Sequence, residues 1–313
     1  MMTDRHGAPA RSSAAAQPAA TASTIRPWAA RSLLFVPGDS PRKLEKALGG
    51  GADLIILDLE DSVAESAKPA ARDHVAEALG QQTRAKPLWV RVNPLDTPHT
   101  LTDLVAIVQH RPDGIMLPKA TPDEALLLGH YLTALEAAAG IEAESIRLIV
   151  VATETAPALF RLGDYAGVPR LDALTWGAED LAAAFGAAAN RDAQGKLLEP
   201  FALARTLCLA GAHAAGIAPI ETIDPNFRDE ERMAKVPADA RKVGFRGMMA
   251  IHPAQVGPIN RAFTPTEEEL ARARRIVALF EENPEAGALQ LDGEMVDIPH
   301  LKQARSLIEL AGR

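Results

Sequence analysis

Short apolar runs that favour β-strands recur at nearly even spacing along this chain, and segments rich in Ala, Leu, Glu and Arg separate most of them. The eight runs are SLLFVPG, ADLIILDLED, LWVRVN, GIMLPKA, RLIVVATET, DALTWGAED, APIETID and GMMAIHP. Strands that alternate with helices form parallel sheets, because each helix carries the chain back to the start of the next strand. Eight such units over about 220 residues are typical of an α/β protein with a (β/α)8 TIM-type barrel.

A doubly wound open sheet is the alternative architecture for the same pattern. It is less favoured because the spacing is nearly even and no glycine fingerprint for a phosphate follows a strand. The one glycine-rich segment, LGGGAD at residues 48–53, precedes a strand, which indicates the end of a helix rather than a dinucleotide loop.

The N-terminal part differs from this repeating region. Residues 1–27 lack hydrophobic periodicity and are predicted to be a disordered tail, with a transit or secretory peptide as the alternative. The barrel is then expected to occupy residues 28–262.

The C-terminal part, residues 263–313, is predicted to be a helical extension that acts as a lid. Thr264 and Glu267 have the spacing of a helix-capping box, with Pro265 at the first helical position. The residues that follow place one apolar stripe on this helix: Leu270, Ala273, Val277 and Phe280. A polar turn and a second amphipathic helix come next. Because this segment lies beyond the eighth strand, it must pack on the barrel or on a neighbouring subunit.

Charge and composition narrow the class of protein. A formal net charge of −8 argues against nucleic acid or an anionic membrane as the main partner. No apolar run approaches the roughly 18 to 20 residues of a membrane span. The single cysteine, Cys208, excludes an internal disulfide and suits a reducing compartment. We therefore expect a cytoplasmic protein.

Polar and charged residues gather where the predicted strands end. In a parallel barrel these ends converge on one mouth, where active sites form. The residues are Asp58, Glu60, Asp61, Arg91, Asn93, Lys119, Glu154, Asp180, Glu221, Asp224 and His252. The concentration of such groups at one edge predicts a polar site there.

Two carboxylates on consecutive strands indicate a metal site. Glu154 in ATETA lies one unit before the adjacent pair Glu179 and Asp180 in WGAEDL, so their oxygens can reach one point. Carboxylates held together repel unless a cation neutralises them, and Mg²⁺ favours one or two protein carboxylates with water and substrate. Spacing alone does not distinguish Glu179 from Asp180. The alternative is that both acids only cap the following helix.

Positive charge at the mouth is expected from Lys119 and Arg72. Arg72 lies just after LDLEDSV, where a loop enters a helix, and its guanidinium could bind a carboxylate or a thioester oxyanion. The alternative is an arginine on a helix surface. His213 is expected to be a packing or surface residue, and no Ser-His-Asp or Cys-His pattern indicates covalent acyl transfer.

Taken together, the motifs resemble those of the citrate lyase β-subunit-like family, which includes malyl-CoA and citramalyl-CoA lyases and a related malyl-CoA thioesterase. The matching stretches follow the family order from about residue 31 to residue 301: RSLLFVPGDSPRKLEKAL, ADLIILDLEDSVAESAKPAAR, VRVN, IMLPKA, ETAPAL, WGAEDLAAAFG, GFRGMMAIHPAQV and GEMVDIPHL. The chain departs from many relatives at LPKATP, which has no acid, and at the long, charged ETIDPNFRDEERMAKV. Both departures border the site and bear on acyl-chain selectivity.

The resemblance implies a (β/α)8 barrel that assembles as homotrimers or hexamers, with Mg²⁺ at the mouth. By this resemblance Glu154 and Asp180 are the metal ligands and Arg72 contacts the substrate's acyl or enolate oxygen. Asp297 is implied to be an acid/base group carried into a neighbouring subunit's site. The other mouth residues, Asp58, Glu60, Lys119 and Arg91, are expected to bind substrate.

The implied reaction is carbon–carbon cleavage of a 3-hydroxyacyl-CoA of the malyl, citramalyl or citryl type. Its products would be a 2-oxo acid and acetyl-CoA or a homologue. Two alternatives stay open: a malyl-CoA thioesterase, and a citrate lyase β-subunit that acts only within a complex.

Overall fold

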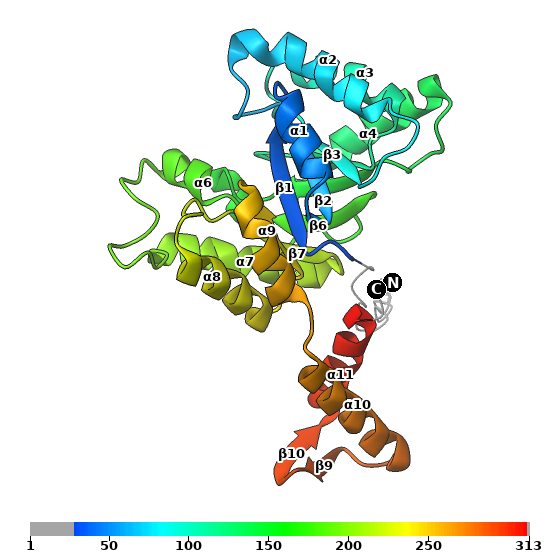
Figure 1. The fold of residues 1–313 in the computed structure, drawn as a ribbon, viewed down its shortest axis with the longest axis vertical. Coiled ribbons are helices and arrows are strands. Elements are labelled where there is room, and N and C mark those ends of the chain that lie inside the picture. Colours follow the sequence, from blue (N-terminus) through cyan, green and yellow to red (C-terminus); the bar gives the residue numbers. More distant parts are fainter. Residues whose placement is uncertain (1–27, 312–313) are drawn as a thin grey trace, which may run out of the picture.

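Eight parallel strands form a closed barrel in which each strand pairs with the next along the chain (Figure 1). The computed structural model describes residues 28–311. The barrel strands are β1 (Ser32–Pro37), β2 (Leu54–Asp58), β3 (Leu88–Arg91), β4 (Gly114–Leu117), β5 (Arg147–Val151), β6 (Leu171–Thr175), β7 (Ala218–Glu221) and β8 (Gly247–Ala250). The barrel closes where Leu33 of β1 pairs with Met249 of β8. The predicted (β/α)8 barrel is confirmed, and the predicted tail lies outside the described residues.

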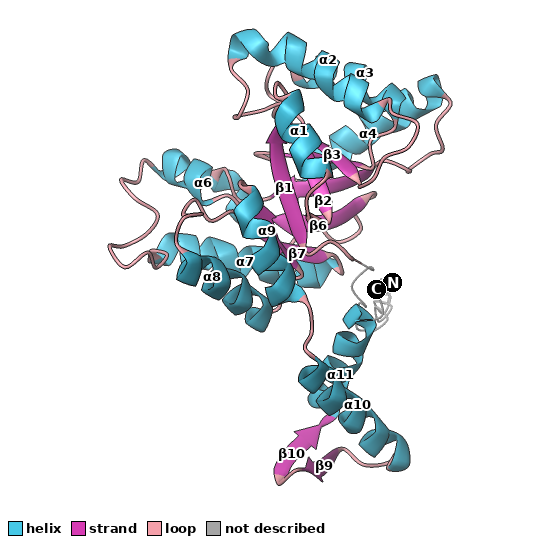
Figure 2. Cartoon of the chain, viewed as in Figure 1, coloured by secondary structure: helices cyan, strands magenta, loops and turns pink. Residues whose placement is uncertain are grey.

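Helices surround the strands and cover the outside of the barrel (Figure 2). They are α1 (Pro41–Leu48), α2 (Lys68–Leu79), α3 (Thr100–Ile107), α4 (Pro122–Ala139), α5 (Ala156–Leu159), α6 (Ala178–Phe185), α7 (Glu199–Ala215), α8 (Glu230–Val243) and α9 (Pro253–Phe263), with short 3₁₀ turns η1 (Glu65–Ala67) and η2 (Val108–His110). Gly49 caps α1, so the glycine-rich segment ends a helix as predicted. None of the helices in the described range has the length and hydropathy of a membrane span.

The side chains of β2 alternate between the inside of the barrel and the layer between the barrel and its helices. Leu54 and Ile56 pack inside the barrel with residues such as Trp89 of β3, whereas Ile55 and Leu57 pack against the helices. Side chains alternate between the two faces of a barrel strand. The alternation therefore directs the last residue of β2, Asp58, to the interior at the C-terminal end of the barrel.

The C-terminal extension contains α10 (Glu267–Glu282), the antiparallel strands β9 (Ala288–Leu291) and β10 (Glu294–Asp297), and α11 (Ile298–Ala311). It projects from the barrel, with the β9–β10 hairpin at its far tip (Figure 1). It has a small core of its own, built around Ile276, Phe280 and Val296. The hairpin was not predicted, because the sequence indicated only a polar turn there.

The start of α10 corrects the predicted capping box. Thr266 is the N-cap, and its hydroxyl accepts a hydrogen bond from the main-chain N–H of Glu269, whose carboxylate accepts one from the Thr266 N–H in return. Thr264 instead ends α9, and its hydroxyl donates to the Asn260 carbonyl. The sequence contains two overlapping Thr-x-x-Glu matches, one that begins at Thr264 and one that begins at Thr266. Only the second begins after α9 has ended.

The extension is joined to the end of the barrel opposite the mouth. Arg31 and Arg246 directly precede β1 and β8, and they donate hydrogen bonds to the hydroxyls of Thr264 and Ser306 at 2.8 and 3.0 Å. Within one chain the extension is therefore not a lid over its own barrel mouth.

Candidate functional site

The C-terminal ends of the barrel strands surround a cavity of about 310 Å³. Its wall includes charged side chains that follow four of the strands: Asp58, Arg91, Glu154 and Asp180. A cavity of about 430 Å³ between α1 and α2 is larger, but none of these four groups lines it. These four of the predicted polar residues thus surround one cavity at the mouth, an arrangement that parallel strands favour.

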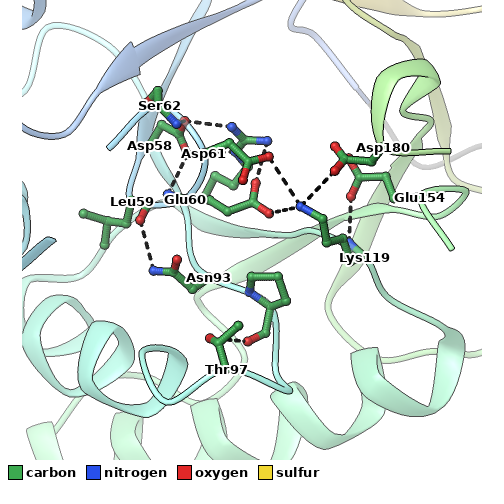
Figure 3. A network of polar contacts seen from close by, with 12 residues as sticks. Asp58, Leu59, Glu60, Asp61, Ser62, Asn93, Thr97, Lys119, Glu154 and Asp180 are labelled. Atoms are coloured by element: carbon green, nitrogen blue, oxygen red, sulfur yellow. Dashed lines mark hydrogen bonds and ion pairs between the residues drawn. The ribbon is translucent and has the colours of Figure 1, made fainter. Parts of the chain in front are cut away.

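Lys119, which follows β4, connects acidic groups that follow two other strands, β2 and β6. Its ammonium lies 2.5 Å from Glu60 Oε1, 3.2 Å from Asp180 Oδ1 and 3.4 Å from Asp61 Oδ2 (Figure 3). Burial disfavours the charged form of Lys119, but the hydrogen bond to Glu60 and the surrounding carboxylates outweigh it and raise its pKa. The backbone of Lys119 is left-handed, with φ of 51°, a conformation that is uncommon for a lysine and is concentrated at functional sites.

Glu154 is a buried carboxylate held close to other negative charges. Its side chain is 5% exposed, and Oε2 accepts a hydrogen bond of 2.7 Å from the main-chain N–H of Lys119. Burial, with the nearby charges of Glu60 and Asp180, raises the pKa of Glu154 to about 8. A cation beside Glu154 would favour its ionised form, because opposite charge lowers the pKa of a carboxyl group.

Gly177 leaves the space that the Glu154 carboxylate occupies. A Cβ atom on Gly177 would lie 2.6 Å from Glu154 Oε1 and 2.7 Å from its Cγ, closer than real Cβ contacts come. Gly177 is also the N-cap of α6, so it joins the end of β6 to the helix that carries Asp180. Sequence reasoning missed this role, although the Trp-Gly pair before the two acids was its signal.

The structure distinguishes the two adjacent acids on α6. Both line the cavity, but Glu179 is exposed, whereas Asp180 is partly buried and joins the Lys119 cluster. Among residues 28–311, no group of three or more His, Cys, Asp or Glu side chains is arranged to hold a metal ion. Glu154 and Asp180 fit Mg²⁺ as a pair of hard oxygen ligands, with water and substrate completing the coordination.

Arg91 supplies the guanidinium of the cavity wall. Its Nε and Nη2 donate two hydrogen bonds of 2.7 Å to Asp58, and Nη1 lies 2.8 Å from Glu60 Oε2. Burial opposes the charge of Asp58, but Arg91 outweighs it and lowers the pKa of that carboxyl group. Burial is the main cause that raises the pKa of Glu60. The two acids thus fix the orientation of Arg91 beside the cavity.

Arg72 is not among the residues that the structure brings to the cavity. It lies on α2, where Nε donates a 2.6 Å hydrogen bond to the buried Asp103 and Nη2 lies 3.0 Å from His99 Nδ1. The sequence placed Arg72 correctly at the start of a helix after β2. Its side chain, however, points to α3, whereas Arg91 lines the cavity and the Lys119 ammonium lies beside Asp180.

Asp297 also lies away from the mouth of its own barrel. It ends β10 in the extension, half-buried, and its Oδ1 is 2.5 Å from His300 Nδ1. This hydrogen bond to His300 lowers the pKa of Asp297. Because the extension is joined to the opposite end of the barrel, Asp297 takes no part in the cavity of its own chain.

Two other predicted strand-end acids are paired with arginines. Glu221 accepts hydrogen bonds from Trp176 Nε1 at 2.6 Å and from Arg205 Nε at 2.7 Å, and Asp224 accepts one from Arg232 at 2.7 Å. Trp176 lines the cavity, so Glu221 fixes part of its wall. His252 caps α9 and stacks on Phe227 with ring centroids 4.4 Å apart.

Comparison with known proteins agrees with this architecture. The family model described as HpcH/HpaI aldolase/citrate lyase matches residues 31–253. The chain is 32% identical to the mitochondrial citramalyl-CoA lyase of Rattus norvegicus over 90% of this chain and 86% of the relative. It is 34% identical to the L-malyl-CoA/beta-methylmalyl-CoA lyase of Rhodobacter capsulatus over 90% of this chain and 94% of the relative.

A solved structure, the protein CitE from Mycobacterium tuberculosis in complex with magnesium, acetoacetate and coenzyme A, superposes with a TM-score of 0.75. It is 31% identical, and the alignment covers 91% of this chain and 99% of that one. The barrel, the order of its motifs and these similarities together show that the chain belongs to the HpcH/HpaI aldolase/citrate lyase family.

Proposed function

We propose that this protein is a Mg²⁺-dependent carbon–carbon lyase that cleaves a 3-hydroxyacyl-CoA thioester to a 2-oxo acid and acetyl-CoA or a homologue. The observation that carries the proposal is the pair Glu154 and Asp180, which face one cavity from consecutive strands with Arg91 and Lys119 beside them. The named relatives are lyases of CoA thioesters, which supports the same class of substrate.

Glu154 and Asp180 are the residues that would hold Mg²⁺. When bound, the ion supplies a Lewis acid and a template for a hydroxy acid carboxylate. Arg91, rather than Arg72, is the guanidinium placed to stabilise negative charge on the thioester oxygen as the carbon–carbon bond breaks. Lys119 balances the charge of Glu60 and Asp180 and keeps these acids close together.

Asp297 is proposed to exchange a proton with the enolate carbon in the site of a neighbouring copy. The proposal therefore includes a homo-oligomer, a trimer or a hexamer. Its support is the distance of the extension from its own mouth, which leaves a single chain without this group. A cytoplasmic location is proposed with it, and the buried thiol of Cys208 fits a reducing compartment.

The test is a panel of malyl-, citramalyl- and citryl-CoA assayed with the purified chain, with and without EDTA. The lyase proposal predicts equal amounts of 2-oxo acid and acyl-CoA, no free CoA thiol, and loss of turnover when EDTA removes the metal. Free thiol without 2-oxo acid would identify a thioesterase instead. Activity only after addition of other subunits would identify a component of a complex.

Asp180→Ala is expected to abolish Mg²⁺-dependent turnover, because it removes one of two protein ligands from the ion. Glu179→Ala is the matched control, since Glu179 is the exposed neighbour on the same helical turn. Initial rates over a Mg²⁺ titration measure both variants. If Glu179→Ala lost turnover and Asp180→Ala kept it, the metal role would belong to Glu179.

A further inference from the structure

A buried lysine holds the loop that carries the mouth acids of β2. Lys68, the first residue of α2, is 8% exposed. Its ammonium donates to the main-chain carbonyls of Leu59 and Glu60 at 2.8 and 3.1 Å and to Asn93 Oδ1 at 2.7 Å. An ammonium has three N–H donors, and these contacts use all of them. Lys68 does not line the cavity, so it acts on the site through the loop.

Asn93 extends this network to a second strand and helix. Its side-chain amide donates to the Leu59 carbonyl at 3.0 Å (Figure 3) and to Asp103 at 2.6 Å. Asp103, which is fully buried on α3, also accepts the Arg72 hydrogen bond. The loop after β2 is thus tied to β3, α2 and α3 by side chains that are buried and fully hydrogen-bonded, which is the condition under which polar networks rigidify a structure.

Lys68 holds Glu60, the mouth acid of this loop, through its main chain. The Glu60 carbonyl accepts from Lys68, while its carboxylate contacts Lys119 and Arg91 on the cavity side. A shift of the Glu60 main chain would therefore move the Glu60 carboxylate, which helps to set the positions of Arg91 and Lys119. Glu154 and Asp180 follow β5 and β6, on other strands, and have no contact with Lys68 among the hydrogen bonds of the described residues.

We propose that Lys68 is a positioning residue for the reaction: its ammonium fixes the Leu59–Glu60 main chain so that Glu60 stands between Arg91 and Lys119. The consequence rests on the proposed function, because it concerns Arg91, the guanidinium proposed to stabilise the thioester oxygen, and Lys119 beside the proposed metal ligand Asp180.

Loss of Lys68 would remove the ammonium that holds both main-chain carbonyls and Asn93 Oδ1 together. The Leu59 carbonyl would keep only the Asn93 amide and the Glu60 carbonyl only the Val63 N–H, so the loop would be held by fewer buried hydrogen bonds. This loss would leave the two proposed metal ligands in place.

The experiment compares Lys68→Met and Lys68→Arg with Lys86→Met in the full chain. Lys86 is the matched control because its ammonium also binds a main-chain carbonyl, that of Ala52 at 2.7 Å, but before β2 rather than after it. Three quantities are measured: amide hydrogen exchange of residues 58–64, the Kd for Mg²⁺ by calorimetry, and kcat with KM.

For Lys68→Met we expect faster exchange in residues 58–64 and a kcat lower by roughly 10- to 100-fold, the size of effect that a small misplacement of catalytic groups causes. The Kd for Mg²⁺ is expected to change much less than kcat, because no hydrogen bond joins Lys68 to Glu154 or Asp180 and the loop reaches these two acids only through Lys119. Lys68→Arg keeps the positive charge, but the N–H groups of a planar guanidinium do not point in the same directions as the three N–H groups of an ammonium. Its kcat is therefore expected to lie between those of the wild type and Lys68→Met. Lys86→Met changes neither loop exchange nor kcat.

Unchanged loop exchange in both Lys68 variants would overturn the proposal. So would faster exchange with wild-type kcat in either variant, or a weakening of Mg²⁺ binding as large as the loss of kcat. If the wild type itself cleaved none of the thioesters, the proposed function would fail, while the exchange measurement would still show whether Lys68 holds the loop. Lys68→Arg keeps the test open if Lys68→Met does not fold.

Discussion

At the scale of single residues, the position of Glu154 depends on the missing side chain of Gly177. Gly177→Ala is expected to displace the Glu154 carboxylate, since the new Cβ would lie 2.6 Å from Oε1. The backbone of Gly177 is extended, with φ of −120°, so the effect would come from this contact and not from backbone strain. We expect Mg²⁺ binding, measured by calorimetry, to weaken roughly 10- to 100-fold, the usual effect of disturbing a group that orients a ligand.

Gly129→Ala is the control for this prediction, because no atom lies within 4 Å of a Cβ built on that glycine. It should bind Mg²⁺ as the wild type does. A Gly177→Ala protein with wild-type affinity would show that Glu154 either is not a ligand or moves without cost.

The sequence predicts the positions of residues better than their partners. Glu154 and Asp180 could be placed at one mouth because strand ends converge whatever the side chains do. Arg72 could not be assigned from its position alone, since a helix start after β2 lets its side chain reach either the cavity or Asp103 on α3. Lys68, four residues earlier, gives no signal at all until the carbonyls of the loop are seen around it.

At the scale of elements, a buried ion pair joins α4 to the start of β6. Arg170 and Glu136 are each 1% exposed at their side chains, and Nη1 and Nη2 of Arg170 lie 2.7 and 2.6 Å from the two carboxylate oxygens. Glu136 also accepts from the main-chain N–H groups of Glu144 and Ile146, before β5. The pair thus fixes one helix to two strands at the end of the barrel away from the mouth.

Arg170→Met should lower the free energy of unfolding by about 3–5 kcal/mol, because it leaves a buried carboxylate without its partner. Urea unfolding monitored by circular dichroism measures the loss, while kcat at 25 °C should stay at the wild-type value. Arg161→Met removes the partner of two exposed aspartates, Asp123 and Asp164, and is expected to change the urea midpoint of unfolding little. Equal midpoints for the two variants would contradict the structural role of Arg170.

Elements that repeat were easier to predict than elements that occur once. All eight barrel strands are where the apolar runs placed them, because each run is a buried strand with a helix behind it. The β9–β10 hairpin was missed, since Glu294 and Met295 are exposed and leave only a weak alternating pattern. The first helix of the extension was found, but its buried stripe contains Ile276 where Val277 was predicted. A helix that packs against one small partner buries a narrow face, so a shift of one position is enough to misplace it.

At the scale of the whole molecule, the proposed site is complete only if a second chain supplies Asp297. Asp180→Ala and Asp297→Ala proteins should each be inactive alone. Co-refolded in equal amounts, they should regain about a quarter of wild-type turnover, because half of the mouths are intact and half of those face an intact Asp297 in a cyclic oligomer. Asp180→Ala mixed with Glu154→Ala is the control: both changes lie in the mouth, so no mixed assembly contains an intact one. If the first mixture regained nothing although mixed oligomers formed, Asp297 would not act across subunits. If Asp297→Ala alone kept wild-type turnover, a group within the barrel itself would exchange the proton.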